Sequence, residues 1–143
     1  MTTGDEQLAE ALRAEHAAIF GYGAIGAKLD KATAQFALQA EEEHRERRDA
    51  LLLRLSQRGG TPPAADPVYT LPVAVTDQAS ALQLAVTIEE RVAARWRSVL
   101  PQAAGEDRTM ALDALIGSAV LATQARRHAG ISPATVPFPG APA

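Results

Sequence analysis

The central stretch Glu41-Glu42-Glu43-His44 places a carboxylate and an imidazole three residues apart in a predicted helix. Residues at this spacing share one helix face, so Glu41 and His44 can reach the same ion. Carboxylate oxygen and imidazole nitrogen suit iron or manganese. In a glutamate-rich helix the same spacing more often belongs to a solvated charge run, so the pair gains meaning only if other helices bring ligands to it. The residues expected on the solvated flank of this helix are Glu42, Glu43, Glu46 and Arg47.

Two further glutamates replace apolar residues in otherwise apolar helix faces. Both faces advance by alternating steps of four and three residues, which is typical of a helix in a bundle. They read Leu8, Leu12, Glu15, Ile19, Tyr22, Gly26 and Leu29 in one helix, and Leu82, Val86, Glu89, Ala93, Trp96 and Leu100 in another. Glu15 and Glu89 are therefore expected to point toward a core, where a carboxylate needs a partner.

Each of these glutamates also has an explanation that involves no metal. Glu15 could form an ion pair inside the protein with Arg48 or Arg127. A shift of the apolar face by one residue leaves open whether Glu89 or Glu90 faces the core. The arginines available to pair with these last two glutamates are Arg91 and Arg95.

The composition favours a helical protein of one domain. The chain has 143 residues, of which 47% are hydrophobic, many of them alanine, and only 4% are aromatic. Alanine and leucine together with glutamate, arginine and glutamine favour helices, while strand-forming residue types are sparse. The predicted fold class is therefore all-α.

Apolar periodicity and helix-breaking residues predict four helices, at about residues 5–29, 32–58, 78–100 and 107–129. Residues 1–130 would form one four-helix bundle, and residues 131–143 a proline-rich tail that packs loosely or extends. The 18 residues from 59 to 76 include four prolines and cannot form a helix. Such a segment reaches ~60 Å when extended, and a 25-residue helix is ~38 Å long. We therefore expect a long crossover, with a disordered linker between two helical hairpins as the alternative.

The predicted hairpins bring polar side chains to matching heights, because residues equally far from the turn of a hairpin lie at the same level. Glu15 and His44 are about equally far from the first turn, and Glu41 is within about one helical turn of that level. In the second hairpin, Glu89 and Gln124 are also about equally far from their turn. We therefore expect these side chains to meet in the core.

This pattern resembles the ferritin-like superfamily, in which helices one and three each supply a glutamate and helices two and four each supply a Glu-x-x-His. The ligands of the first three helices have counterparts in this chain, namely Glu15, then Glu41 with His44, and Glu89. Tyr22, two turns after Glu15, is also similar to ferritin. Over its whole length the chain looks like the small actinobacterial ferritin-like domains of unknown function, the DUF4439 type. The resemblance implies a ferritin-like four-helix bundle with one long crossover between helices two and three.

The fourth helix departs from the family pattern. It contains no Glu-x-x-His, and its nearest residues are Gln124 and His128, with Ala125 where the glutamate is expected. The second metal position of a di-iron centre therefore lacks its usual ligands. We do not expect a complete di-iron oxygenase site.

Charge and composition argue against several other classes of protein. A net charge of -3 argues against nucleic-acid and anionic-membrane binding. No cysteine is present, which excludes thiolate metal sites and thiol catalysis and fits a cytoplasmic protein. We see neither a secretion signal nor an apolar run approaching the ~20 residues of a membrane span. An alanine-rich stripe, expected on the outer surface of the first helix, predicts a homodimer: Ala11, Ala14, Ala18 and Ile25.

Two functions are compatible with these residues. One is a ferritin-like four-helix protein with an incomplete, degenerate metal site and no catalytic residues. The other is an iron- or manganese-binding ferritin-like oxidoreductase. The expected metal ligands are Glu15, Glu41, His44 and Glu89, and the cofactor is iron, manganese or none. We favour the first function because the fourth helix lacks its carboxylate. Whether the protein is an enzyme, and which small molecule it would act on, stay open.

Overall fold

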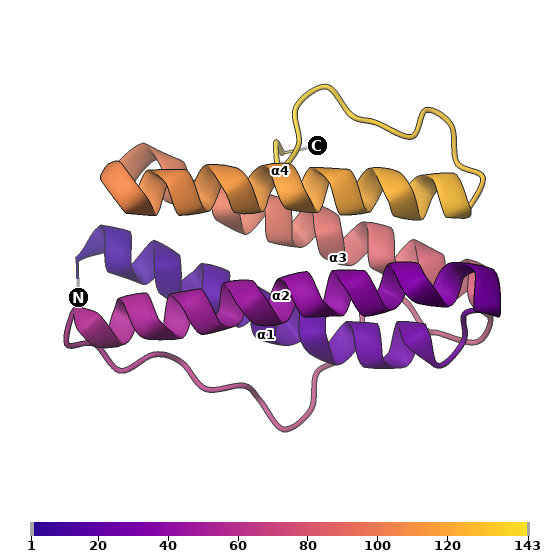
Figure 1. Cartoon of the computed structure of the whole chain (residues 1–143), viewed down its shortest axis with the longest axis horizontal. Helices are drawn as coiled ribbons and strands as arrows, with labels where there is room; N and C mark the ends of the chain where they lie inside the picture. The colour runs from indigo at the N-terminus through magenta and orange to yellow at the C-terminus, as the bar shows by residue number, and fades with distance from the viewer. Residues whose placement is uncertain (1, 143) are drawn as a thin grey trace.

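The described part of the chain folds into four long helices, which Figure 1 shows packed side by side. The computed structural model describes residues 2–142, which form α1 (Thr3–Gly26), α2 (Lys31–Gln57), α3 (Gln78–Val99) and α4 (Gly105–His128), with a short 3-10 helix, η1 (Leu100–Gln102), after α3. Within residues 2–142 there is no β-strand, and no helix is long and apolar enough to cross a membrane. The predicted all-α fold class is confirmed, and the helix ends lie close to the predicted ones.

Side-chain caps fix the beginnings of three helices. Oγ1 of Thr2 accepts a hydrogen bond from the backbone N–H of Asp5 at the start of α1. Asp30 caps α2 and Asp77 caps α3, each accepting from the N–H three residues later. Such caps satisfy N–H groups that have no partner in the first turn of a helix.

The helices run up, down, down and up along the bundle (Figure 1). α1 packs against both α2 and α3, while α4 packs mainly against α3 and touches α2 much less. Because α2 and α3 run in the same direction, the chain between them returns along the length of the bundle (Figure 1). This is the predicted long crossover, and the architecture is the predicted four-helix bundle.

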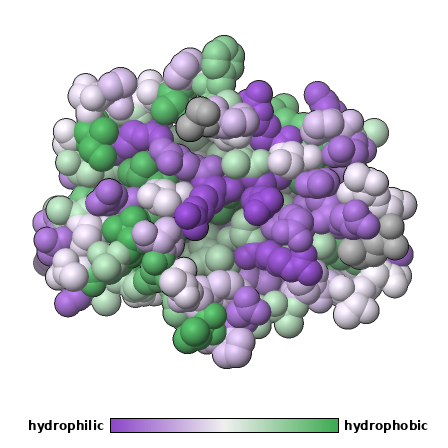
Figure 2. Space-filling view, turned by 180° about the vertical axis from the view of Figure 1, so that it is seen from behind, coloured by the Kyte–Doolittle hydropathy of each residue, from purple (hydrophilic) through white to green (hydrophobic). Residues whose placement is uncertain are grey.

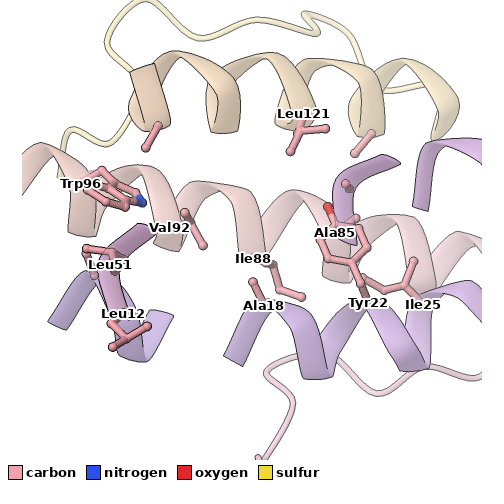
Figure 3. Packing of buried hydrophobic residues seen from close by; sticks show 14 of the residues in the cluster. Leu12, Ala18, Tyr22, Ile25, Leu51, Ala85, Ile88, Val92, Trp96 and Leu121 are labelled. Carbon is pink, nitrogen blue, oxygen red and sulfur yellow. The ribbon is translucent and has the colours of Figure 1, made fainter. Parts of the chain in front are cut away.

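The bundle core combines aliphatic and aromatic side chains (Figure 3). Leu12, Leu51 and Leu121 are buried there, each with at most 1% of its surface exposed. Tyr22 and Trp96 are the largest fully buried side chains. Their hydroxyl and indole N–H groups need hydrogen-bond partners inside the protein, so the core must also contain polar groups.

The alanine-rich stripe of α1 is not an outer surface. Ala11, Ala18 and Ile25 are buried and Ala14 is half-buried. α1 lies against α2 and α3, which cover these residues. The prediction that this stripe lies on the outer surface is therefore wrong, and the homodimer itself stays a prediction.

The described part of the C-terminal tail is mostly exposed, but two arginines hold it. Nη1 of Arg126 donates to the carbonyl of Ala134 at 3.2 Å, and Nη1 of Arg97 donates to the carbonyl of Pro139 at 3.3 Å. Gly140 lies so close to the backbone of Ala93 that a Cβ there would clash with it. The tail thus passes back over α4, and residues 139 and 140 lie against α3.

Candidate polar centre in the bundle

Three of the predicted polar residues meet in the middle of the bundle. Nδ1 of His44 lies 2.5 Å from Oε2 of Glu15, and Nε2 of His44 lies 2.8 Å from Oε2 of Glu89. None of these three side chains has any exposed surface. The imidazole of α2 therefore bridges a carboxylate from α1 and a carboxylate from α3.

Two aromatic side chains donate to the same carboxylates. Nε1 of Trp96 donates to Oε1 of Glu15 at 2.7 Å, and the Tyr22 hydroxyl donates to Oε2 of Glu89 at 2.5 Å. The Tyr22 ring also stacks on the His44 ring, with centroids 5.5 Å apart. Figure 3 shows Trp96 and Tyr22 at two separate levels of the bundle. Their polar tips thus hold the two carboxylates in place.

A guanidinium group lies beside this centre. Nη1 of Arg47 is 3.7 Å from Oε1 of Glu15 and donates to Oγ of Ser118 on α4 at 2.9 Å. The Arg47 side chain is only 14% exposed, so its predicted place on the solvated flank is wrong. A Cβ at position 117 would clash with this guanidinium, so Gly117 makes the room for it. Arg47 therefore fills the space between α2 and α4.

Electrostatic interactions fix the protonation of His44 and Tyr22. Burial alone would lower the pKa of His44, but the charges and hydrogen bonds of Glu89 and Glu15 outweigh it and raise that pKa to about 10. Burial, then the charge and hydrogen bond of Glu89, hold the pKa of Tyr22 well above its ordinary value. At neutral pH both groups are protonated and donate. One imidazolium and one guanidinium then balance two carboxylates.

One carboxylate oxygen in this centre is not satisfied. Within residues 2–142, Oε1 of Glu89 is the buried side-chain polar atom that has no hydrogen-bond partner. Its sister oxygen accepts from both His44 and Tyr22. A buried acceptor without a donor is uncommon and calls for an explanation.

Glu41 does not join the centre. Its carboxylate accepts a hydrogen bond from Nη2 of Arg45 at 2.7 Å, and its side chain is 21% exposed. Ala40, one residue earlier, takes the buried position on α2. The structure thus brings together Glu15, His44 and Glu89 and leaves Glu41 outside, so the expected approach of Glu41 and His44 to one point is wrong.

The open question on α3 has a clear answer. Glu89 faces the core, whereas the side chain of Glu90 is 57% exposed and accepts from Nη2 of Arg126 at 2.7 Å. Arg48, a predicted partner for Glu15, instead pairs with Asp49. The positive partners of Glu15 are His44 and Arg47.

The fourth helix contributes differently from the prediction. Gln124 is half-buried, has no hydrogen bond to Glu89 and lines a groove on the surface. His128 is exposed and packs against the ring of Phe36. Ser118 is the α4 side chain that reaches the neighbourhood of the centre, through Arg47. Glu89 and Gln124 line the same groove, but no hydrogen bond joins them within residues 2–142.

The donor groups as arranged do not fit a metal ion. A metal binds a neutral imidazole nitrogen, but each ring nitrogen of His44 faces a carboxylate oxygen, and the raised pKa of about 10 favours the protonated ring. The imidazole lies between Glu15 and Glu89, so the three side chains do not surround a common point. Across residues 2–142, no group of three or more histidine, aspartate or glutamate side chains is placed to hold a metal ion.

Comparison with known families identifies the chain. Residues 7–143 match the family model described as Domain of unknown function (DUF4439). The protein belongs to the DUF4439 family. A search among curated proteins finds no match. The family membership therefore classifies the chain but assigns no activity to it.

Solved structures support this placement of the DUF4439 chain. A conserved hypothetical protein, rv2844, from Mycobacterium tuberculosis is 39% identical, with a TM-score of 0.86 over 90% of this chain and 98% of that one. A structure described as ferritin like, diiron-carboxylate proteins, from Bacillus anthracis str. Ames is 19% identical, with a TM-score of 0.60 over 91% of this chain and 95% of that one. The second likeness concerns the fold alone, and it confirms the ferritin-like bundle predicted for this DUF4439 protein.

Proposed function

We propose that this chain is a non-catalytic ferritin-like module whose interior carries a metal-free charge network in place of a degenerate metal site. The observation that carries the proposal is the position of His44 between two carboxylates, with a hydrogen bond at each ring nitrogen. A bridging imidazolium neutralises the charge that would otherwise attract a cation. It also leaves no imidazole lone pair for coordination.

Arg47 adds a second argument for the proposal. Its guanidinium is permanently charged and lies 3.7 Å from Oε1 of Glu15. A divalent cation at the same carboxylate would be repelled at short range by this fixed charge. The small residues Gly117 and Ser118 accommodate the guanidinium on α4, where a metal-binding bundle of this fold supplies a Glu-x-x-His.

In this proposal the network contributes to the structure of a binding module. Glu15, His44 and Glu89 tie α1, α2 and α3 together at one level, and a buried polar network of this kind can specify how helices pair. A cytoplasmic location and a homodimer remain predictions. The exposed apolar residues of α4 offer a homodimer a different surface from the predicted one, namely Leu112, Ile116 and Val120.

A second candidate function is iron or manganese binding. It is favoured by Oε1 of Glu89, which is buried and has no hydrogen-bond partner, and by the diiron-carboxylate description of the Bacillus anthracis neighbour. For this candidate to hold, His44 must lose a proton and turn toward a shared point with Glu15 and Glu89. The ion would then bind to these carboxylates and the imidazole.

Metal retention distinguishes the two candidates. The purified protein is loaded anaerobically with ferrous iron or manganese and passed through a desalting column, and bound metal is measured by mass spectrometry. His44→Ala, His44→Gln and the flank variant Glu41→Ala are treated in parallel, and circular dichroism establishes which variants are folded. We expect no stoichiometric metal in any sample. Stoichiometric metal that His44→Ala loses and Glu41→Ala retains would establish the metal-binding candidate instead.

A further inference from the structure

The face of the bundle formed by α1, α3 and the crossover has a hollow at its centre (Figure 2). A cavity of about 490 Å³ lies there. Its floor is apolar and is formed mainly by small side chains of the two helices: Ala14, Ala17, Ala18, Ile88, Val92 and Ala94. In Figure 2 the pale green floor is flanked by strongly hydrophilic residues. We call this cavity the rear groove.

The crossover forms one wall of the rear groove, through residues 69–72. This wall is held against α1 at two points. The rings of Phe20 and Tyr69 pack with centroids 5.4 Å apart, and Nε2 of His16 lies 3.0 Å from the carbonyl oxygen of Pro63. The Tyr69 hydroxyl also accepts from the backbone N–H of Asp66. The crossover therefore packs as a defined wall and does not only connect two helices.

Two arginines on α3 form the opposite wall. Arg91 and Arg95 are one helical turn apart, both are exposed, and both line the groove, which has no acidic side chain in its lining. Neither arginine makes a side-chain hydrogen bond or an ion pair with another part of residues 2–142. The nearest candidate on the helix, Glu90, is paired with Arg126. The predicted pairing of Arg91 and Arg95 with α3 glutamates is therefore wrong, and their donors are available.

A second cavity shows why the rear groove is the better binding site. It has a volume of about 540 Å³ and lies between α3, α4 and the C-terminal tail. Its lining includes two glutamates, Glu89 and Glu90, and its Arg126 already donates to Glu90 and to the carbonyl of Ala134, so it suits an anion less well. In the rear groove the lining charges are all positive, and no hydrogen bond or ion pair joins them to another side chain among residues 2–142.

We propose that the rear groove binds a small amphipathic anion, with its oxyanion head on Arg91 and Arg95 and its apolar part on the alanine floor. Guanidinium groups bind carboxylates and phosphates through paired, charge-assisted hydrogen bonds. A cavity of about 490 Å³ is within the range of small-molecule sites, which are mostly apolar with a few placed polar groups. The proposal does not depend on the interior centre, because both arginines are exposed and neither forms a hydrogen bond or an ion pair with Glu15, His44 or Glu89.

Three probes with the same chain and different heads test the proposal: hexanoate, hexyl phosphate and hexylamine. Each is titrated into the isotope-labelled full chain, and backbone amide shifts are followed by NMR. We expect hexanoate, hexyl phosphate or both to shift amides of residues 14–18 and 88–95, with hexylamine at least tenfold weaker. Comparison of the first two probes identifies the preferred head group.

Two variants locate the binding. Replacing both arginines (R91Q/R95Q) should weaken binding of the anionic probe about tenfold or more, since two charge-assisted contacts are lost. The matched control R45Q/R97Q removes two arginines elsewhere and should leave binding unchanged. Ala17→Phe fills the floor and should abolish binding, whereas Ala32→Phe, at the exposed start of α2, should not.

Any of three results would overturn the proposal. The first is equal binding of hexanoate and hexylamine, and the second is anion binding that survives both R91Q/R95Q and Ala17→Phe. The third is a self-association, measured by analytical ultracentrifugation, that Ala17→Phe abolishes while no probe binds. That last result would assign the rear groove to a second copy of the chain.

Discussion

Two charge networks in this protein each join two carboxylates through one basic side chain, but they lie at different depths. The interior network joins Glu15, His44 and Glu89, none of which has any exposed surface. The other network lies at one end of the bundle, where Arg58 bonds Asp5 of α1 and Asp107 of α4. The Arg58 side chain is 32% exposed. We call the two the interior network and the end network.

The difference in depth determines what each interaction contributes. In the end network Asp107 is buried, but Arg58 and Asp5 reach the surface, so water can solvate either of them when the other is removed, and their ion pair contributes little to stability. Water does not reach the interior network, so removal of one partner leaves a buried charge without compensation. The contacts reflect this, because each buried carboxylate has at least two donors or cations around it.

The largest expected effect is that of His44→Ala. The substitution leaves Glu15 and Glu89 buried without their shared imidazolium, and loss of one partner of a buried ion pair costs about 3–5 kcal/mol. We expect the free energy of unfolding, measured by urea denaturation followed by circular dichroism, to fall by that amount or the variant to be unfolded. Glu41→Ala, on the flank of the same helix, should change it by less than about 1 kcal/mol. Equal effects of the two substitutions would refute the distinction between interior and flank.

The interior network also predicts that alkaline conditions destabilise the protein. The pKa of His44 in the folded protein is about 10, above its ordinary value of 6.5. The stabilisation from its proton is therefore complete below pH 6.5 and is lost as the pH rises through about 10. Urea unfolding at a series of pH values should show this decline in the wild type and a flatter profile in His44→Gln. A wild-type stability that stays constant across this range would contradict the protonated bridge.

Arg47→Met should have an intermediate effect. The substitution keeps a long side chain between α2 and α4 but removes the hydrogen bond to Ser118 and the charge beside Glu15. Loss of a charged partner from a largely buried acceptor costs about 1–3 kcal/mol. Arg45→Met, two residues earlier, removes an exposed pair with Glu41 and should cost less than about 0.5 kcal/mol. Thermal unfolding of the two variants side by side measures the contrast, and a smaller loss for Arg47→Met would overturn the assignment.

The sequence allowed most of the fold to be predicted because its signals are local. Steps of four and three residues place Glu15 and Glu89 on apolar faces, and both are buried. The prolines and the length of segment 59–76 predicted the crossover, which the structure contains. Each of these inferences concerns a single helix or a single connection, so helix periodicity or segment length is enough to make it.

The errors in the site arose where two helices that are distant in sequence must fit together. Periodicity alone does not decide whether α2 buries Ala40 or Glu41, or whether Arg47 or Arg48 turns inward. Arg47 turns inward because Gly117 on α4 has no side chain and leaves space for the guanidinium. The small residues Gly117 and Ser118 indicate that another helix approaches α4 closely at this point. Which side chain of α2 fills the space depends on how α2 and α4 align, and the sequence pattern of either helix alone does not determine that alignment. Gln124 was misplaced for the same reason, since α4 turns Ala125 inward.

The smallest expected effect is that of Asp5→Asn in the end network. The hydrogen bond from Arg58, with help from Thr2, lowers the pKa of Asp5 below its ordinary 3.8. The stabilisation from ionised Asp5 is therefore present above pH 3.8 and is lost as the pH falls through the lowered pKa, opposite in direction to that of His44. At neutral pH we expect Asp5→Asn to lower the free energy of unfolding by about 0.5–1 kcal/mol, and added salt to reduce this difference. A loss as large as that of His44→Ala would mean that the end network is shielded from water, and depth would then no longer explain the contrast between the two networks.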